Sequence, residues 1–572
     1  MVGISICSYS PNLSSILEDQ DVIYRNKNFI VLNSTKYNYP VSTLRVDQDI
    51  ILILEGKIYG ETFESIVAEL KTLSAENIDE KLSSYAFNLD GEFYFYKIDI
   101  AKSQIAVFGD HLNRLPLYYG SENQQWVISR QIKIAYFFLK PKISSLNLAE
   151  FMVFDYNLAD RTWFENIFCL QLDDYIQIDA LNNILQVKKK KTTYNFEDKT
   201  KTKNTNALLE EMAEIFTKAC SNRAETTNVL SMSGGMDSRS VAAGLVKGKK
   251  PLLGVTFENA EKTALYDGII AKEIADALTI KWQKISLTRE SFNCDIDSLM
   301  KVKMSIQPCR FYFLYQFCNE VSKRFGSTIT FFTGDGGDKV FPDLSKNLKF
   351  DNDLKLFKLI IKENHEFTIN QAAKIIGVSE KELENQIFSY IKDLPATTSA
   401  GKLEQFTLRA RMKRYIFEGE DRNRNYFWST TPFLSKEFFS LMMRLDPEIK
   451  RQKNFYFDFI AHINHDVASI RNENYSKGKL QIGKGLYSFI KKLSNRYLSR
   501  KSKEYLKAIF KSSSSPNASA KQYIMEINKL LPVNTLLDEK NISRNLNTYS
   551  TGQLSLLLTY LKVDEIMKAH KV

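Results

Sequence analysis

Short runs of hydrophobic residues dominate the first third of the chain. Three of these runs, residues 49–60, 91–100 and 103–110, are rich in β-branched and aromatic residues and are bounded by Gly, Asp or Asn, which is typical of β-strands. Two segments with helical spacing of apolar residues, 62–73 and 146–157, interrupt them. This part of the sequence therefore predicts a strand-rich α+β sandwich.

The pattern changes at a polar stretch. Residues 188–206, "KKKKTTYNFEDKTKTKNTN", contain almost no aliphatic side chains, as expected for a linker. We therefore predict an N-terminal domain over residues 1–190, a linker over 191–206 and a second domain over 207–572.

After this linker, helical and strand-like segments alternate along the chain. The predicted helices are 205–222, 238–248 and 266–279, and the predicted strands are 227–233, 251–258 and 327–337. This order indicates βαβ units and hence an α/β domain with a parallel sheet. Beyond about residue 345 the pattern is mostly helical.

Composition narrows the class of protein. The 572 residues are 44% hydrophobic and 25% charged, without an apolar run long enough to cross a bilayer. The first residues lack a basic segment followed by an apolar one, and the six cysteines form no CxxC pair, so we expect a cytoplasmic protein with reduced thiols. The net charge of +11 suits an anionic ligand without identifying one.

The stretch "SMSGGMDSRS", residues 231–240, joins a predicted strand to a predicted helix. Its two adjacent glycines allow the backbone to approach a bulky anion, and the helix N-terminus supplies free N–H groups. Asp237 would repel a phosphate unless a cation lay between them, so it implies Mg²⁺. The alternative, a tight turn with Asp237 as a helix cap, fits the strand-to-helix setting less well.

A second glycine-rich loop, "TGDGGDKVF", follows the strand predicted to end near Phe332. Ligands of parallel sheets bind at the carboxyl ends of the strands. We therefore expect the two loops to meet, with Asp237 and Asp338 facing the same metal. Taken alone this second loop is weak evidence, because Gly and Asp are common in turns.

Together these segments resemble the asparagine synthetase family. "LSMSGGMDSRSVA", "PLLGVTFENAE", "YDGIIAKEIADAL" and "FTGDGGDKVF" are similar to its synthetase domain, and "EGKIYG", "LDGEFYFYKID" and "GDHLNRLPLYYG" to its glutaminase domain. A later segment, "EDRNRNYFWSTTPFLSKEFF", is similar to its DR…PFLD region. The resemblance extends from residue 1 to about 490. It implies an N-terminal-nucleophile hydrolase-like sandwich followed by an ATP pyrophosphatase domain.

The resemblance also implies a set of site residues. ATP would be bound by Leu230, Ser231, Ser233, Gly234, Gly235, Asp237, Ser238, Val255, Phe257, Gly334, Asp335 and Gly336, and Mg²⁺ by Asp237 and Asp338. Lys477, Lys479 and Lys484 are candidates for a catalytic lysine, and a solvated basic loop is an equally good interpretation of them. The implied reaction is adenylation of a carboxylate, followed by attack of an amine.

Two departures from the family fall in the glutaminase half. The nucleophilic cysteine expected after the initiator methionine is Val2, and Glu55 replaces an asparagine that would donate to the oxyanion. Cys7 is five residues further along a predicted strand, too far to substitute. Without a nucleophile and with a misplaced negative charge, we expect no glutaminase activity.

Two further departures fall in the synthetase half. Lys339 stands where many members carry an acid, and "WSTT" from Trp428 replaces an E-x-R-x segment before "PFL". We expect from this a substrate that is larger or less polar than aspartate.

The sequence therefore predicts an AMP-forming amide ligase without its own glutaminase. Its partners would be a small-molecule or peptide carboxylate and an amine or ammonia, with a biosynthetic partner protein as a further candidate. We expect no membrane partner, and a nucleic acid is disfavoured. An intramolecular ligase of the β-lactam-forming or lasso-peptide-cyclising kind, and a non-catalytic partner in a biosynthetic complex, remain alternatives. A tRNA thiolase is disfavoured by the N-terminal resemblance and the missing CxxC pair.

Overall fold

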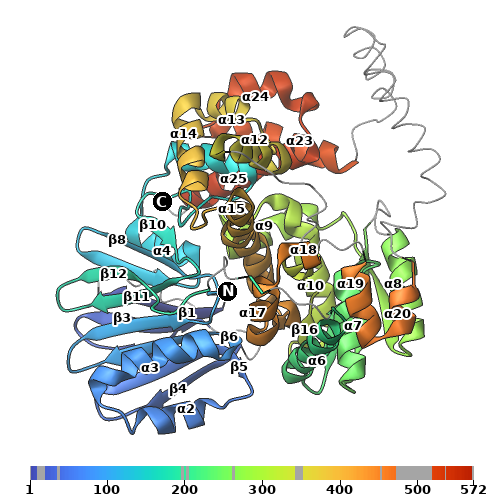
Figure 1. The fold of residues 1–572 in the computed structure, drawn as a ribbon. Helices are drawn as coiled ribbons and strands as arrows, with labels where there is room; N and C mark the ends of the chain where they lie inside the picture. The colour runs from blue at the N-terminus through green and yellow to red at the C-terminus, as the bar shows by residue number, and fades with distance from the viewer. Residues whose placement is uncertain are drawn as a thin grey trace.

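The computed structural model describes residues 2–9, 20–34, 39–194, 199–200, 205–259, 265–341, 352–450, 454–471, 518–534 and 536–569. Figure 1 shows the N-terminal sheets in blue and cyan, a helix-covered sheet in green and brown, and a mostly helical group that includes the red C-terminal helices. No helix in this described part of the chain is long and apolar enough to span a membrane.

The N-terminal part is a sandwich of two six-stranded sheets whose paired strands are antiparallel, as predicted. One sheet has the order β10-β8-β9-β1-β3-β2, formed by Ile167–Cys169, Tyr118–Glu122, Gln125–Ser129, Gly3–Ser8, Phe29–Ser34 and Asp21–Arg25. The other has the order β12-β11-β7-β6-β5-β4, formed by Ile184–Lys189, Asp174–Asp179, Gln104–Gly109, Asp90–Asp99, Ile50–Tyr59 and Val41–Arg45.

The two sheets share one core. Ile4 and Val31 of the first sheet pack in the same buried cluster as Ile53, Tyr94 and Val107 of the second. The helices α2 (Phe63–Leu70) and α3 (Ala75–Asn88) cover the other face of the second sheet, in a cluster with alternate residues of β5 and β6. Because both faces of these strands are covered, they read as nearly continuous hydrophobic runs rather than as polar–apolar alternation.

The second part is built on a five-stranded parallel sheet, also as predicted. Its order is β15-β14-β13-β16-β17, formed by Lys281–Ser286, Leu253–Glu258, Asn228–Ser231, Thr330–Phe332 and Trp428–Thr430. Chain order runs outward from β13 through β14 to β15 on one side, and through β16 to β17 on the other. The order therefore reverses between the neighbours β13 and β16, which is where open α/β sheets bind ligands. The short edge strand β17 was not foreseen in a region whose pattern is mostly helical.

Helices surround this sheet and form the rest of the chain. Those near the sheet are α6 (Thr205–Arg223), α7 (Met236–Lys247), α8 (Leu265–Ala277), α10 (Tyr312–Phe325), α17 (Lys436–Arg444), α19 (Phe455–Ile463) and α20 (His465–Ser469). A second group comprises α9 (Phe292–Lys303), α12 (Asp353–Asn364), α13 (Ile369–Ile376), α14 (Glu380–Lys392), α15 (Ser399–Phe406), α23 (Ala518–Leu530), α24 (Glu539–Asn545) and α25 (Thr551–Ala569). This group shares a core with α4 (Ile132–Leu139) and α5 (Ser145–Phe154) of the N-terminal part.

An unusual helix joins the two halves. Residues Thr407–Phe417 form a π-helix, labelled η3, followed directly by α16 (Glu418–Asn423). π-Helices are rare in proteins, and those that occur are often found at functional sites. On one side, Arg414 of η3 donates to the carbonyl oxygens of Asn157, Ala159 and Arg161 in the N-terminal part.

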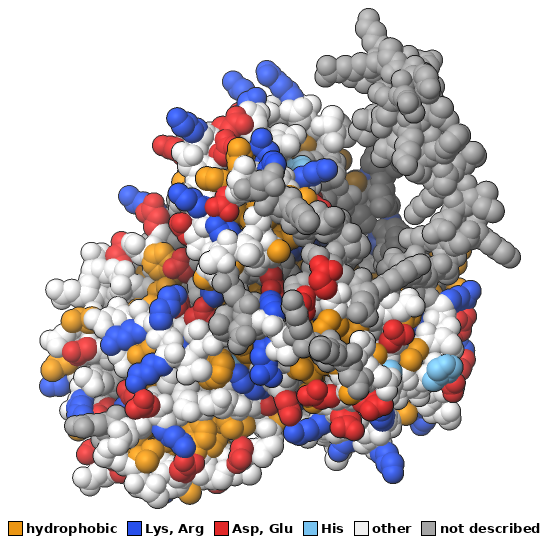
Figure 2. All heavy atoms as spheres, viewed as in Figure 1, with side chains coloured by type: hydrophobic (Ala, Val, Ile, Leu, Met, Phe, Trp, Pro, Cys, Tyr) orange, Lys and Arg blue, Asp and Glu red, His pale blue; other side chains and the backbone are white. Residues whose placement is uncertain are grey.

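Charged residues are mixed on the visible surface. Figure 2 shows Lys and Arg interspersed with Asp and Glu over the described part of this face. The excess of positive charge is therefore not gathered into one patch on that face.

Candidate active site

The first glycine loop is folded around two serine hydroxyls. β13 ends at Ser231 and α7 begins at Met236. Between them the Ser233 N–H donates to Ser238 Oγ over 3.0 Å, the two hydroxyl oxygens lie 3.1 Å apart, and the Gly235 N–H donates to Ser233 Oγ over 3.2 Å. The loop thus reaches the N-terminus of α7, whose N–H groups and dipole favour an anion.

Gly234 is held closely by α8. Its N–H donates to Asp267 Oδ1 over 2.9 Å. A Cβ at this position would lie 3.0 Å from the Cβ of Ile270 and 3.2 Å from Asp267 Oδ1, so a side chain here would displace α8 or the loop. The glycine is therefore required by close packing as well as by access of a ligand to the backbone.

The second glycine loop lies directly against the first. A Cβ on Gly334 would come within 2.6 Å of the Ser238 nitrogen, and a Cβ on Gly337 within 2.5 Å of Asp237 Cγ. Gly336 has φ +94°, in the left-handed region that glycine adopts without strain. The structure thus brings the loops after β13 and β16 into contact at the point where the strand order reverses.

Three aspartates gather where the loops meet. Burial raises the pKa of Asp237 to about 6, against a hydrogen bond of 2.7 Å from the Tyr456 hydroxyl, and the charge of Asp338 raises it further. Burial also raises the pKa of Asp335 to about 6, in spite of Arg422, and the charges of Asp338 and Asp237 contribute. Asp338 is paired with Lys339. Carboxylates whose negative charges raise one another's pKa in this way favour binding of a cation between them.

Mg²⁺ fits these residues when it is bound together with phosphate. Within the described residues, no three His, Cys, Asp or Glu side chains are arranged to hold a metal on their own. Mg²⁺ is commonly held by one or two carboxylates together with phosphate oxygens and water. Asp237 and Asp338 can supply such a partial set beside the Ser233–Ser238 loop.

A cavity of about 390 Å³ opens from the two loops. It is lined by Ser231, Ser233, Asp237, Ser238, Thr333, Gly334, Asp335, Gly336, Asp338 and Lys339 at the loop end, and by Leu314, Phe317, Cys318, Phe331, Arg411, Tyr415, Ile416, Arg422 and Asn423 elsewhere. Its volume is within the usual range for small-molecule sites. Sequence analysis identified most of the loop end and none of the opposite wall.

Arg422 is the most enclosed cation of that wall. Its side chain is 5% exposed, it donates to Asn423 Oδ1 over 3.0 Å and weakly to Gln307, and its Nε has no hydrogen-bond partner among the described residues. Burial lowers its pKa, while Asp335 and Glu420 oppose that change. Because Arg422 lines the cavity, its guanidinium group can receive a carboxylate or phosphate oxygen there.

The other predicted residues lie around this cavity without lining it. Leu230 and Val255 are fully buried in the sheet, and the Val255 carbonyl accepts from Met232. Phe257 packs against Phe317, with ring centroids 5.5 Å apart. The candidate lysines Lys477, Lys479 and Lys484 lie outside the described residues.

Trp428 is not among the residues that line this cavity. The substrate larger or less polar than aspartate that was expected from this segment stays a prediction. The Trp428 ring packs in the N-terminal core, its Nε1 donates to the Tyr59 hydroxyl over 3.1 Å, and Arg424 stacks on it at 4.8 Å. The reason is the position of β17 at the edge of the sheet, which turns alternate side chains toward the sandwich.

In the N-terminal part, the position expected to carry a nucleophile is closed. Val2 is 5% exposed. Beside it, Glu55 and Arg130 form a fully buried ion pair of 2.9 Å, and a Cβ on Gly3 would lie 2.6 Å from Glu55 Oε1 and from Arg130 Cγ. Cys7 is fully buried in β1, and burial raises the pKa of its thiol to about 12. The described residues therefore present no reactive thiolate at this place.

The carboxylate of Glu55 accepts hydrogen bonds from several neighbouring groups. It accepts from the hydroxyls of Tyr39 and Tyr96, each over 2.7 Å, and from the Ile4 N–H over 3.3 Å. It was expected to face a developing oxyanion. The structure shows it instead as the centre of a hydrogen-bonded network that fills this part of the sandwich.

The network continues into the second half of the chain. Arg130 also pairs with Asp421 of α16, and Asp421 pairs with Lys303. Lys303 is 2.9 Å from Glu418, which accepts from the Tyr118 hydroxyl over 2.5 Å. A continuous chain of buried charges thus joins the surroundings of Gly3 to α16, the helix that carries Arg422.

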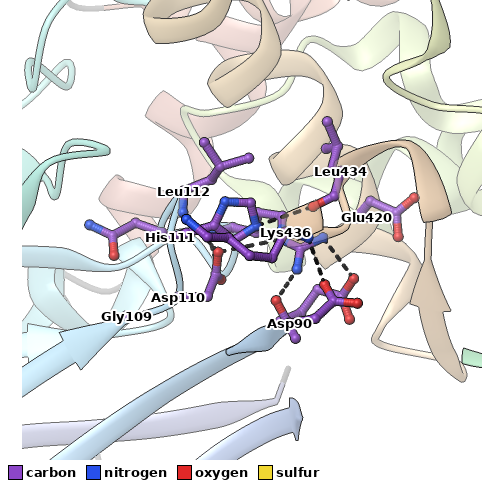
Figure 3. A network of polar contacts seen from close by, with 12 residues as sticks. Asp90, Gly109, Asp110, His111, Leu112, Glu420, Leu434 and Lys436 are labelled. Carbon is purple, nitrogen blue, oxygen red and sulfur yellow. Dashed lines mark hydrogen bonds and ion pairs between the residues drawn. The ribbon is translucent and has the colours of Figure 1, made fainter. Parts of the chain in front are cut away.

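A second set of contacts joins the halves beside Asp90 (Figure 3). Burial disfavours ionisation of Asp90, but Arg223, which makes two hydrogen bonds of 2.7 Å, keeps its pKa below the ordinary value. The Lys436 N–H donates to Asp90 over 3.0 Å. His111 contacts the Leu434 carbonyl at 3.2 Å. Asp90 is therefore used by the interface.

Residues beyond the linker thus form an α/β domain with a cavity at the point where the strand order reverses. Residues 211–456 match the family described as asparagine synthase. This region is therefore similar to the asparagine synthase family, in agreement with the resemblance seen in the sequence.

Comparison with solved structures finds distant similarities. NMN synthetase from Francisella tularensis is similar at 16% identity and a TM-score of 0.21, over 37% of this chain and 97% of that one. U34-tRNA thiolase NcsA from Methanococcus maripaludis is similar at 15% identity and a TM-score of 0.20, over 50% of this chain and 88% of that one. Scores this low carry no argument of their own. No curated protein sequence matches the chain.

Proposed function

We propose that the protein is a cytoplasmic, ATP-dependent, AMP-forming amide ligase without glutaminase activity of its own. It would adenylate a carboxylate, release pyrophosphate and transfer the acyl group to an amine or to ammonia. The observation that carries the proposal is the contact between the Ser233–Ser238 loop and the Gly334–Asp338 loop, with Asp237 and Asp338 at their junction.

Each group has a role that follows from its position. The N–H groups at the start of α7 and the hydroxyls of Ser233 and Ser238 would hold phosphate oxygens. Asp237 and Asp338 would hold Mg²⁺, which supplies charge neutralisation of the phosphates when bound. Arg422, which lines the cavity outside the two loops, would orient the carboxylate substrate with its guanidinium group.

The nitrogen source follows from the N-terminal part. Since Glu55 and Arg130 fill the space beside Gly3, we propose that the amine comes from solution or belongs to the substrate itself. The second case would be an intramolecular ligase of the β-lactam-forming or lasso-peptide-cyclising kind. The N-terminal sandwich would then act as a support for the second domain.

ATP–pyrophosphate exchange tests this proposal. The purified protein is incubated with Mg·ATP, labelled pyrophosphate and pools of amino acids, small carboxylic acids and peptides, with and without amines. We expect exchange that depends on one class of carboxylate, AMP as the nucleotide product, and loss of both in Asp237→Asn. ATP turnover to ADP and phosphate, or stable Mg·ATP binding without exchange for any carboxylate, would favour a kinase-like or non-catalytic role.

A further inference from the structure

Arg239 immediately follows the Ser233–Ser238 loop, which we call the phosphate loop, and is fully buried. Its guanidinium makes no ion pair among the described residues and instead donates to four carbonyl oxygens. These are Gly234 at 3.1 Å, Val467 at 3.2 Å, Ile470 at 2.6 Å and Arg471 at 2.9 Å. Burying an arginine without a counter-charge is costly, so the position of these carbonyl groups is closely linked to the position of the side chain.

One of the four carbonyls belongs to the phosphate loop. The Gly234 C=O accepts from Arg239, and the Gly234 N–H donates to Asp267. The residue is therefore held from both sides, by α7 and by α8. A shift of Arg239 would move the loop that is proposed to bind phosphate.

The other three carbonyls belong to Val467 in α20 and to Ile470 and Arg471, which directly follow this helix. The last carbonyl groups of a helix have no partner within the helix, and here Arg239 supplies donors at the helix end. A second contact connects the same part of the chain to the site, because Tyr456 of α19 donates to Asp237 over 2.7 Å. The segment 454–471 is thus fastened to the phosphate loop at two places.

We propose that Arg239 is a positioning residue that couples the phosphate loop to the end of α20, so that binding of Mg·ATP and ordering of residues 465–471 stabilise each other. The proposal rests on the proposed function, since it takes the loop as the phosphate site. Coupling of this kind is reciprocal: the factor by which bound Mg·ATP favours the ordered segment equals the factor by which ordering of the segment strengthens Mg·ATP binding.

Arg239→Met and Arg239→Lys test the loop side of the coupling. Met keeps much of the side-chain volume without donors, and Lys restores the charge and part of the hydrogen bonding. We expect Arg239→Met to bind Mg·ATP about tenfold more weakly, Arg239→Lys to be intermediate, and wild type to show slower hydrogen exchange over residues 465–471 when Mg·ATP is present. In Arg239→Met this protection should be lost.

Asn464→Ala tests the other side and does not depend on the folding of the Arg239 variants. The Asn464 side chain caps α20 by accepting from the Val467 N–H over 3.0 Å, and it does not touch the loop. We expect it to weaken Mg·ATP binding as well. The matched control is Lys247→Ala, which removes another α7–α19 contact, to the His462 carbonyl, at the exposed far end of α7.

The outcomes separate the two proposals. Wild-type affinity for Mg·ATP in both Asn464→Ala and a folded Arg239→Met, or unchanged exchange over residues 465–471 in wild type, would overturn the coupling and leave the ligase proposal in place. Absence of Mg·ATP binding in wild type would overturn the proposed function and the coupling with it.

Discussion

Asp237 and Gly337 are in contact across the two loops, and the contact leaves no space for a methyl group. A Cβ on Gly337 would lie 2.5 Å from both Cγ and Oδ1 of Asp237, although the backbone of Gly337 is not in the left-handed region. The glycine is therefore needed for the approach of the carboxylate. The contact shows directly that the two loops meet, which the two sequence motifs could only suggest.

Gly337→Ala should separate the loops and abolish measurable Mg·ATP binding while the protein stays folded. The matched control is Gly268→Ala in α8, where a Cβ would have no neighbour within 4 Å; it should bind normally and be stabilised by up to about 1 kcal/mol. Calorimetric titration with Mg·ATP distinguishes them. Normal binding by Gly337→Ala would show that the loops need not touch.

The protein should release no glutamate from glutamine, and Val2→Cys alone should not create this activity. The reason is steric as well as chemical, because Glu55 and Arg130 occupy the space beside Gly3. Glutamate release is measured with and without ATP, before and after a glutamine-site alkylating analogue. Release that the analogue abolishes would contradict the prediction.

Arg130→Met should destabilise the folded protein by about 3–5 kcal/mol, because it leaves the buried carboxylate of Glu55 without a counter-charge and Asp421 with Lys303 as its remaining partner. Urea unfolding measures the effect. The control, Lys191→Ala, breaks an ion pair to Glu80 whose side chains are 76% and 67% exposed; it should cost no more than about 1 kcal/mol. Equal effects would mean that the buried chain of charges does not hold the halves together.

The stability of the ligand-free protein should fall as pH rises from about 4.5 to about 7, through Glu420. Burial raises the pKa of Glu420 to about 7, with Arg424 opposing and Asp335 contributing. Because the folded state binds this proton more tightly than the unfolded state, the stabilisation is present at low pH and is lost as pH passes the folded pKa. Glu420→Gln should therefore flatten this part of the profile and be more stable than wild type above pH 7, by roughly 1–3 kcal/mol.

The matched variant for that experiment is Glu80→Gln on the surface, which should leave the pH profile of unfolding unchanged. A Glu420→Gln profile with the same slope as wild type between about pH 4.5 and 7 would contradict the assignment.

The sequence predicted the parts of the site that depend on local backbone geometry. Adjacent glycines between a strand and a helix permit close approach of a ligand, and Asp237 beside them favours a cation, so residues 231–240 predict a binding loop after β13. The sandwich and the parallel sheet followed from hydrophobic runs in the same way. Neighbouring positions in sequence carried these signals.

The parts that depend on long-range packing could not be predicted. Arg422 and Tyr415 reach the cavity because η3 and α16 cross from the N-terminal part to the sheet, which no local pattern indicates. Trp428 was expected near the substrate because the edge strand β17 was not recognised in the sequence. One feature of the sequence could have indicated a role for Arg239, because it is a charged residue among the mostly apolar residues of α7. Asp267 could have been noticed as an acidic residue in the first turn of α8.

Titration calorimetry of Mg·ATP with wild type, Asp237→Asn and Asp338→Asn tests the central claim most directly. The account predicts that wild type binds ATP only with Mg²⁺, that each variant loses at least about tenfold in affinity, or about 1.4 kcal/mol, and that neither variant is less stable without ligand. Asp237→Asn should in fact be more stable above pH 6, because burial raises the pKa of this carboxyl to about 6. Unchanged affinity for Mg·ATP in both variants would contradict the assignment of these loops as the nucleotide site.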